Sequence, residues 1–332
     1  MLMQQISGNR SMRPFVVLAA VGLVFLAQGG STLVSASLGY SILQQFATLG
    51  PIALALGLTM IIRHFDLSVA GHATVGGCIA VTLGVASPIG GIAAAAIFGL
   101  LFGALQGVLI VWLRLGSIGV TLGGLLTLNG IAYVITGNQE ISLQRMELAQ
   151  FVDDPLFLLA SPRFLLAAAL VVLAGFIAAR TRLWPQIQAT GSDPQAAVVA
   201  GVPTGVITLV IFALSGLLSA CAGALLSYSL AAASPTALSN ILVPAAAAAI
   251  IGGVSLGGGR GHPVGIAGGV LVLCTLQSCL TAIGVKPFAQ DIVTGAVLLA
   301  VGISDSVELK RRLHDLRRLL PGRPRPRPTS EL

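Results

Sequence analysis

Long apolar stretches separated by short polar breaks occupy most of this chain. Each stretch has about 20 residues, the length at which an α-helix crosses a hydrocarbon core about 30 Å thick. Because lipid leaves no partner for unpaired backbone groups, and no ten-residue alternating strand pattern is present, we expect helices rather than a barrel. The pattern predicts ten spans, at residues 14–29, 40–62, 67–86, 89–113, 118–136, 157–179, 204–230, 240–256, 263–284 and 287–304.

The composition supports a membrane protein. The chain is 55% hydrophobic and 9% charged, which excludes a soluble globular domain, and its 41 glycines suit close contact between helices. The predicted fold class is therefore all-α, a polytopic membrane protein with about ten transmembrane helices. The first span also permits a second interpretation, a signal peptide cleaved near Val34-Ser35-Ala36. An uncleaved signal anchor is favoured because many spans follow.

The basic residues set the orientation. With the N-terminus in the cytoplasm and ten alternating spans, seven basic residues fall in cytoplasmic breaks and eight in the C-terminal tail, against three on the other side. Both termini are therefore expected to be cytoplasmic, with eight spans as the alternative count. The expected organisation is a cytoplasmic N-terminus (1–13), a transmembrane permease domain (14–304) and a basic cytoplasmic tail (305–332), disordered at its end.

The net charge of +7 comes mainly from this tail. A basic segment next to the last span is attracted to anionic lipid, so we expect membrane lipid rather than nucleic acid as its partner. On the opposite side, residues 137–155 form the longest expected loop and are acidic. This loop is either a solvated connection or a docking rim for a partner outside the cytoplasm.

A polar segment at 188–202 lies between two apolar spans. Ser192 or Asp193 can cap a helix, Pro194 suits its first position, and Gly201 suits its end. Alanines give this helix a small, smooth surface that could enter a groove on another protein. The sequence therefore predicts a short cytoplasmic helix that contacts a partner, with a plain loop between spans as the alternative.

Two other breaks interrupt the apolar pattern. Asp66 is an ionisable residue at or near membrane depth, where such residues are costly and usually functional. It could cap the next helix, pair with Arg63, or act directly in transport or gating. The second break runs from Gly252 to Gly265, and seven of its fourteen residues are Gly. We expect a tightly packed cytoplasmic turn, although such breaks also line solute pathways in transporters.

No segment predicts an enzyme. A P-loop requires Gly-x-x-x-x-Gly-Lys-Ser/Thr, and neither lysine of the chain follows a glycine. The histidines are scattered, and no His, Cys or carboxylate cluster has metal-ligand spacing, so no catalytic residue, metal or cofactor is expected in this chain. If ATP drives transport, the ATPase is a separate subunit that holds the ATP-Mg.

Four segments resemble the permease subunits of bacterial ABC importers for ribose and related monosaccharides, within the branched-chain amino acid permease superfamily. His64–Gly71 is similar to that family's Gly-Ile-Asp-Leu-Ser-Val-Gly segment, and Val120–Gly123 to its Val-Thr-Leu-Gly run. Gly191–Ala197, followed by Gly201-Val202, resembles its cytoplasmic coupling segment, and Gly252–Gly261 its glycine-rich run. The resemblance covers about residues 40–305, in order.

The chain departs from that pattern at several positions. Arg63 and His64 stand where the family has small residues before the Asp. In the coupling segment, Gln195 replaces an acidic residue and Val198 a basic one. The second change removes a polar contact with the ATPase. Such tuning for a particular partner fits a permease that pairs with a non-identical permease, and homodimer and heterodimer both stay open.

The resemblance implies a permease subunit for a sugar or sugar-like solute in the bacterial inner membrane. It also implies three partners, namely an ABC ATPase, an extracytoplasmic solute-binding protein and a second permease subunit. The implied ATPase-coupling residues are Gly191, Asp193, Pro194, Gln195, Ala196, Ala197 and Gly201. The candidate gating or pathway residues are Asp66, Ser68, Thr121, Gly252, Gly253 and Arg260. Alternatives are a permease for another small polar solute such as an amino acid, a secondary transporter or channel without an ATPase, and a membrane enzyme.

Overall fold

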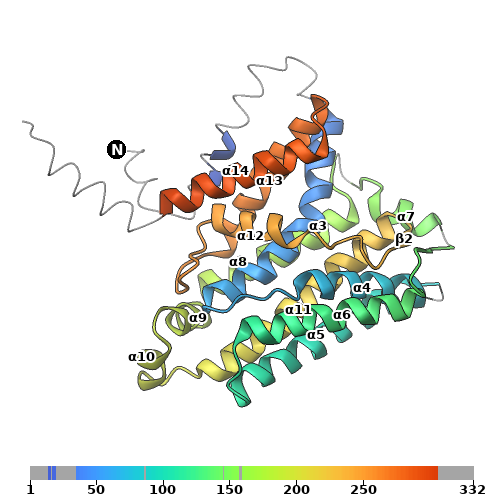
Figure 1. Ribbon diagram of the computed structural model, residues 1–332. Helices are drawn as coiled ribbons and strands as arrows, with labels where there is room; N and C mark the ends of the chain where they lie inside the picture. Colours follow the sequence, from blue (N-terminus) through green and yellow to red (C-terminus); the bar gives the residue numbers. More distant parts are fainter. Residues whose placement is uncertain are drawn as a thin grey trace, which may run out of the picture.

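The computed structural model describes residues 14–15, 17–19, 35–85, 87–144, 146–156 and 159–305. The chain is mainly helical, with one small pair of strands (Figure 1). The long helices are α3 (Ala36–Ile61), α5 (Pro88–Trp112), α6 (Ser117–Thr136), α8 (Pro162–Arg180), α11 (Thr204–Ser229) and α13 (Pro263–Ala282). The other helices are α4 (Val69–Leu83), α7 (Met146–Asp153), α9 (Leu183–Ser192), α10 (Pro194–Val199), α12 (Leu242–Ile251) and α14 (Pro287–Asp305).

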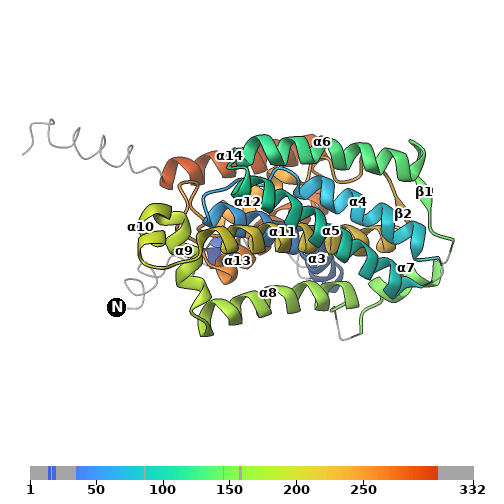
Figure 2. The same cartoon turned by 90° about the horizontal axis from the view of Figure 1, so that it is seen from below.

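Helix α11 lies at the centre of the bundle and packs against α5, α4 and α3. On the outer sides, α6 packs on α4, whereas α8, α12 and α13 pack on α3 (Figures 1 and 2). The contacts of α11 are close because glycines face neighbouring backbone. A Cβ on Gly223 would lie 1.8 Å from the carbonyl oxygen of Ala73, and one on Gly99 would lie 2.3 Å from that of Gly216. Small residues therefore set the spacing of the central helices.

Within the described residues, six helices are long and apolar enough to cross a membrane: α3, α5, α6, α8, α11 and α13. Helices α4 and α12, and the Pro287–Leu299 part of α14, are apolar but shorter. These nine helices correspond to nine of the ten predicted spans. The span at 14–29 lies largely outside the described residues, as do the N-terminal segment 1–13 and nearly all of the basic tail. The count of ten, the side of the termini and the domain limits therefore stay predictions.

Three features differ from the sequence prediction. Strands β1 (Ile141–Ser142) and β2 (Ala232–Ala233) pair antiparallel. Within the expected acidic loop, α7 packs against α8 and α11. Helix α9 precedes the predicted coupling helix, whereas the sequence predicted polar residues but no separate helix there. These short elements depend on contacts between distant segments, which local sequence pattern does not reveal.

Candidate functional site

The predicted short helix is present as α10, and it is capped as the sequence indicates. The Asp193 side chain accepts hydrogen bonds from the backbone N–H groups of Gln195 (3.0 Å) and Ala196 (3.1 Å), and Pro194 occupies the first turn. Ala197 is buried against the body of the protein. Gly201 ends the segment with a φ of +82°, a conformation that glycine adopts without strain.

The outward surface of α10 is apolar, although the residues around it are polar. Val198 is 58% exposed and Val199 is 90% exposed. Both project from a helix of six residues at one extremity of the molecule (Figure 1). Gln195 and Ala196 are also exposed. The C-terminal end of the helix therefore exposes two valines to the surroundings, and its N-terminal end is polar. We call the two valines the apolar tip of α10.

The last residues of α9, just before α10, contact two other segments. We call this contact the joint, and it is formed by Ile61, Gly191, Ser192, Gly258 and Gly259. The Gly259 N–H donates to the carbonyl oxygen of Ile61 at 2.8 Å. A Cβ on Gly191 would lie 1.8 Å from that oxygen and 2.7 Å from the Gly259 nitrogen. Gly191 thus fits only because it has no side chain. Two of the four segments that carry the family resemblance, Gly191–Ala197 and Gly252–Gly261, meet at this contact.

The glycine-rich break ends α12 at Ile251, and α13 starts at Pro263. Gly258 and Gly259 both have positive φ, at +78° and +70°. Gly252 packs against the backbone of Gly265, and Gly253 turns the chain with a φ of +89°. Arg260 is exposed. The break is therefore a tightly packed turn, and the side of the membrane on which it lies stays a prediction.

A cavity of about 340 Å³ lies beside the joint. The residues that line it include His64, Arg114, Thr190, Pro194 and Thr208. Burial lowers the pKa of His64. It also lowers the pKa of His262, whose ring lies against Trp184 at 5.6 Å between centroids. His262 caps α13, because its Nδ1 accepts from the Val264 N–H at 3.2 Å.

Asp66 is completely buried, and its carboxylate has three donors. Oδ1 accepts from the backbone N–H of Ser68 at 2.9 Å and from the Ser68 hydroxyl, and Oδ2 accepts from the Ser215 hydroxyl at 2.7 Å. Ser215 lies eleven residues into α11, or about 16 Å along its axis. The carboxylate therefore lies well inside the bundle and stabilises the start of α4 there.

Arg63 forms no ion pair with Asp66 in the described structure. Arg63 is exposed, has a φ of +68°, and packs with its Cβ near Gly258 at the joint. The Asp66 carboxylate fixes the turn that leads into α4 by accepting from the Ser68 N–H, and Ser68 itself occupies the N-cap position. Of the two structural roles that the sequence left open for Asp66, this one is closer to the cap than to the ion pair. Thr121 also belongs to this region, because its hydroxyl donates to the Phe65 carbonyl oxygen at 3.2 Å and so attaches α6 to the segment before α4.

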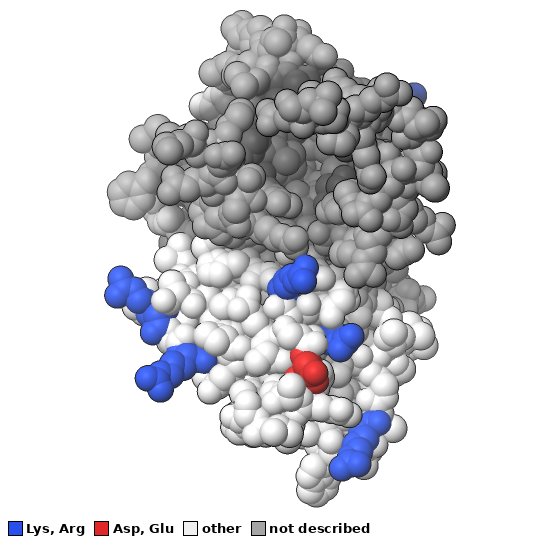
Figure 3. All heavy atoms as spheres, turned by 90° about the vertical axis from the view of Figure 1, so that its left-hand side faces the viewer, with Lys and Arg blue, Asp and Glu red and all other residues white. Residues whose placement is uncertain are grey.

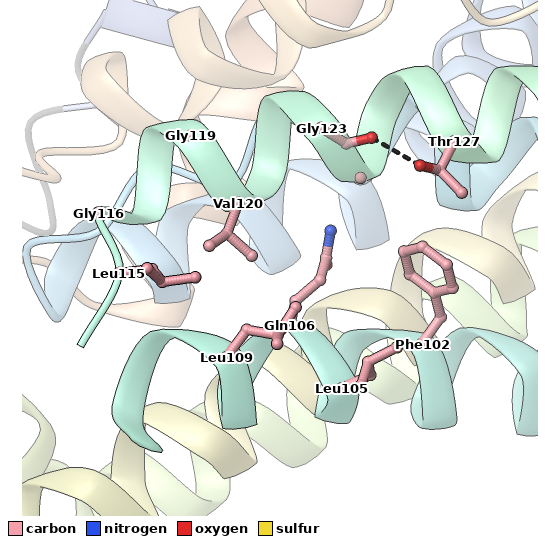
Figure 4. A pocket seen from close by; sticks show the side chains of 11 residues that line it. Phe102, Leu105, Gln106, Leu109, Leu115, Gly116, Gly119, Val120, Gly123 and Thr127 are labelled. Carbon is pink, nitrogen blue, oxygen red and sulfur yellow. Dashed lines mark hydrogen bonds between the residues drawn. The ribbon is translucent and has the colours of Figure 1, made fainter. Parts of the chain in front are cut away.

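The Asp66 network reaches a cavity of about 620 Å³ between α5 and α6. Ser68 Oγ lies 3.0 Å from Gln106 Oε1, and a hydroxyl has one proton, so Ser68 donates either to Gln106 or to Asp66. The Gln106 nitrogen points across the cavity toward α6 (Figure 4) and has no hydrogen-bond partner among the described residues. Phe102 and Thr127 lie at one end of this cavity.

A second polar cluster, not predicted from the sequence, lies at the end of the bundle opposite the joint. It surrounds a cavity of about 380 Å³ between α3, α8, α11, α12 and α13. Its polar lining residues include Ser41, Gln44, Gln45, Thr48, Arg163 and Gln277. The four polar residues of α3 recur at helical spacing within an apolar span. That spacing is the signal that could have identified them.

Comparison with known proteins identifies the family. Residues 38–302 match the family described as "Branched-chain amino acid transport system / permease component". The chain is 32% identical to the autoinducer 2 import system permease protein LsrC of Escherichia coli O157:H7, over 84% of each chain. It is 31% identical to LsrC of Yersinia pseudotuberculosis, over 76% of this chain and 73% of the relative.

A third relative is the L-arabinose transport system permease protein AraH of Escherichia coli K12. It is 29% identical to this chain, over 79% of this chain and 80% of the relative. No solved structure gave a significant match. The family match spans the whole helical bundle from α3 to α14, and the relatives cover the same region at similar length. This chain therefore belongs to the family of branched-chain amino acid transport system permease components, and it is a multi-pass membrane permease.

Proposed function

We propose that this chain is the membrane-spanning subunit of an ATP-binding-cassette importer for a sugar or sugar-like solute. The observation that carries the proposal is the joint. The end of α9 packs tightly against the end of α3 and the turn before α13, and it leads directly into α10, a capped surface helix with an exposed apolar tip. Such an arrangement can transmit a displacement of α10 into the bundle. Because the sequence contains no P-loop, the energy source is a separate subunit.

The charge distribution supports a cytoplasmic location for α10. Basic side chains predominate over acidic ones on the described part of this end of the molecule (Figure 3). Arg63, Arg114, Arg180, Arg182 and Arg260 follow or precede the helix ends there. Glu140, Glu147, Asp153 and Asp154 belong to the segment at the opposite end. Cytoplasmic loops carry the excess of Lys and Arg in membrane proteins, so the joint faces the cytoplasm.

In this arrangement, the tip of α10 enters a groove on the ATPase. Val198 and Val199 supply the apolar contact, and Asp193 keeps the helix formed when the partner is absent. ATP-Mg binds to the ATPase, and this chain needs no cofactor. Gly191 and Gly259 convert a movement of α10 into a movement of α3, because their backbones touch Ile61 directly.

A soluble binding protein delivers the solute at the acidic end, and a second permease subunit completes the pathway. The relatives support this assembly, because they are permease proteins of import or transport systems. The names of these relatives give autoinducer 2 and L-arabinose as the transported solutes, and both favour a sugar-like solute here. The family description names branched-chain amino acids, so an amino acid is the second candidate.

The test is ATP-dependent uptake by the complete complex in proteoliposomes, with the binding protein outside and ATP at the face that carries α10. We expect uptake of a radiolabelled monosaccharide that stops when ATP is omitted and is not driven by a proton gradient. Uptake by the purified chain alone, driven by an ion gradient, would overturn the proposal. Uptake of leucine instead of any sugar would change the solute class and leave the coupling mechanism intact.

A further inference from the structure

The cavity of about 380 Å³ at the outer end, which we call the outer pocket, has the size of a small-molecule site. The first half of α3 supplies one wall, and α8 and α13 supply Arg163 and Gln277. Thr48 lies thirteen residues before Ile61, so the pocket reaches about 20 Å from the joint along α3. It therefore extends from the outer end into the bundle.

The outer pocket has no free charge in the described structure. Arg163, which is only 5% exposed, lies with Nε 3.2 Å from Asp153 Oδ1 and donates to Gln44 Oε1 through Nε (3.0 Å) and Nη2 (2.7 Å). Asp153 in turn accepts from the Ser229 hydroxyl. The guanidinium is thus paired with a carboxylate, and Nη1 also lies 3.5 Å from Thr48 Oγ1. Among the described residues that line the pocket, Arg163 alone is charged.

What remains free in the pocket is uncharged and both donates and accepts. Gln45 donates to Ser278 Oγ at 2.9 Å, which leaves its carbonyl oxygen available. The Gln277 amide makes no hydrogen bond within the described part of the chain. The hydroxyls of Ser41 and Thr48 have only long contacts, with Ser278 Oγ at 3.4 Å and with Arg163 Nη1 at 3.5 Å, so both can rotate toward a ligand. Leucines of α11 and of the segment before α12 form the opposite wall.

This chemistry discriminates between the two solute classes. An amino acid would give up part of the hydration of a carboxylate and an ammonium group, and among the described lining residues it would find no unpaired counter-charge in exchange. A polyol exchanges hydrogen bonds with amides and hydroxyls, and its C–H faces can lie against leucines. We propose that the outer pocket binds the transported solute, a neutral polyhydroxylated molecule of monosaccharide size. Gln45 and Gln277 contact it, and Arg163 positions Gln44; the proposal rests on the importer function above.

The first test is chemical access to a cysteine placed in the pocket. The four native cysteines are buried, so Ser41→Cys adds the reactive thiol, and Gln139→Cys, in the exposed segment after α6, is the matched control. The full complex in detergent is treated with a membrane-impermeant, charged methanethiosulfonate. We expect a monosaccharide from a panel of L-arabinose, D-ribose and D-galactose to slow labelling at position 41 at least threefold and to leave position 139 unchanged.

Leucine at the same concentration should leave labelling at both positions unchanged. Protection by leucine and by no sugar would overturn the solute class that we assign to the pocket. Unchanged labelling in the presence of a sugar that the same complex transports would overturn the pocket as a binding site, with the importer function intact. A complex that transports none of these sugars would contradict the proposed function itself, so the two failures are distinguishable.

The second test uses variants that remove hydrogen bonds. Gln45→Leu and Gln277→Leu are compared with Gln150→Leu, an exposed glutamine of α7 outside the pocket. One lost hydrogen bond is worth about 0.5–1.5 kcal/mol, or roughly two- to tenfold in affinity. We expect the sugar concentration that half-protects Ser41→Cys to rise by that factor in the two pocket variants and to stay at the wild-type value in Gln150→Leu, with all three variants assembling into the complex. Equal half-protection in all three variants would contradict the assigned contacts.

Discussion

At the scale of single residues, Asp66 shows how a costly group becomes part of the structure. Its carboxylate accepts from the Ser68 N–H just before α4 and joins this segment to α11 through the Ser215 hydroxyl. The sequence indicated that Asp66 matters, because ionisable residues at membrane depth are rare. It did not reveal Ser215, which is 149 positions away in the chain. A contact at such a separation leaves no local pattern.

Replacement of Asp66 by Ala should destabilise the protein, whereas Asn should be tolerated. Alanine leaves buried donors of Ser68 and Ser215 without an acceptor, at about 1–3 kcal/mol for each unpaired group. Asparagine keeps one carbonyl oxygen for the Ser68 N–H. Thermal unfolding of the purified chain in detergent measures the difference. An Ala variant as stable as the wild type would show that the network is not structural, and loss of transport by a stable Asn variant would favour a direct role in gating.

His262 should make stability depend on pH. Burial lowers the pKa of this side chain below its usual 6.5, so the folded state favours the neutral ring that caps α13. The resulting stability is complete above pH 6.5. It declines as the pH falls below that value, and it is lost once the pH falls through the depressed pKa of the folded state.

His262→Asn preserves a capping side chain but does not titrate. We expect its melting temperature to fall less than that of the wild type between neutral pH and about pH 5. His64, whose pKa is also lowered by burial, contributes in the same direction in both proteins. Parallel pH profiles for the two proteins would contradict the role assigned to His262.

At the scale of elements, the joint is the feature that only the structure reveals. Helix α10 was predictable from its cap and its proline, and the break before α13 was predictable from its glycines. Helix α9 was not, because its polar, glycine-containing end suggests a loop. Its helical form is consistent with packing, since Trp184 and Gly191 are buried against the bundle. The sequence thus predicted the parts at this end but not their contact.

Gly191→Ala should reduce coupling without unfolding the protein. The added Cβ would lie 1.8 Å from the Ile61 carbonyl oxygen, so α9 must move away and weaken the Gly259–Ile61 hydrogen bond. We expect uptake per ATP hydrolysed to fall at least tenfold, with near-normal amounts of protein in the membrane. Gly119→Ala is the control, because its Cβ would meet nothing within 4 Å. Normal coupling in the Gly191 variant would exclude the joint as the transmission point.

At the scale of the whole molecule, glycine positions organise the bundle around α11. Helix α11 packs against α3, α4 and α5. It thereby connects the Asp66 network with the end of the bundle that carries the joint and with the opposite end, which carries the outer pocket. The apolar pattern predicted the helices, but it did not predict which of them is central, because all are apolar on several faces. That choice depends on small residues such as Gly99 and Gly223, whose partners are distant in sequence.

The central claim is that this permease works through a separate ATPase that binds at α10. The most direct measurement is affinity purification of the full chain from its native membrane in gentle detergent, followed by identification of the bound proteins and assay of ATP hydrolysis. We expect a P-loop ATPase to co-purify with the wild type and with Gln150→Leu. We expect the ATPase to be lost when Val199, which is 90% exposed, is replaced by Glu. Recovery of the chain alone, folded and active in uptake without ATP, would contradict the account.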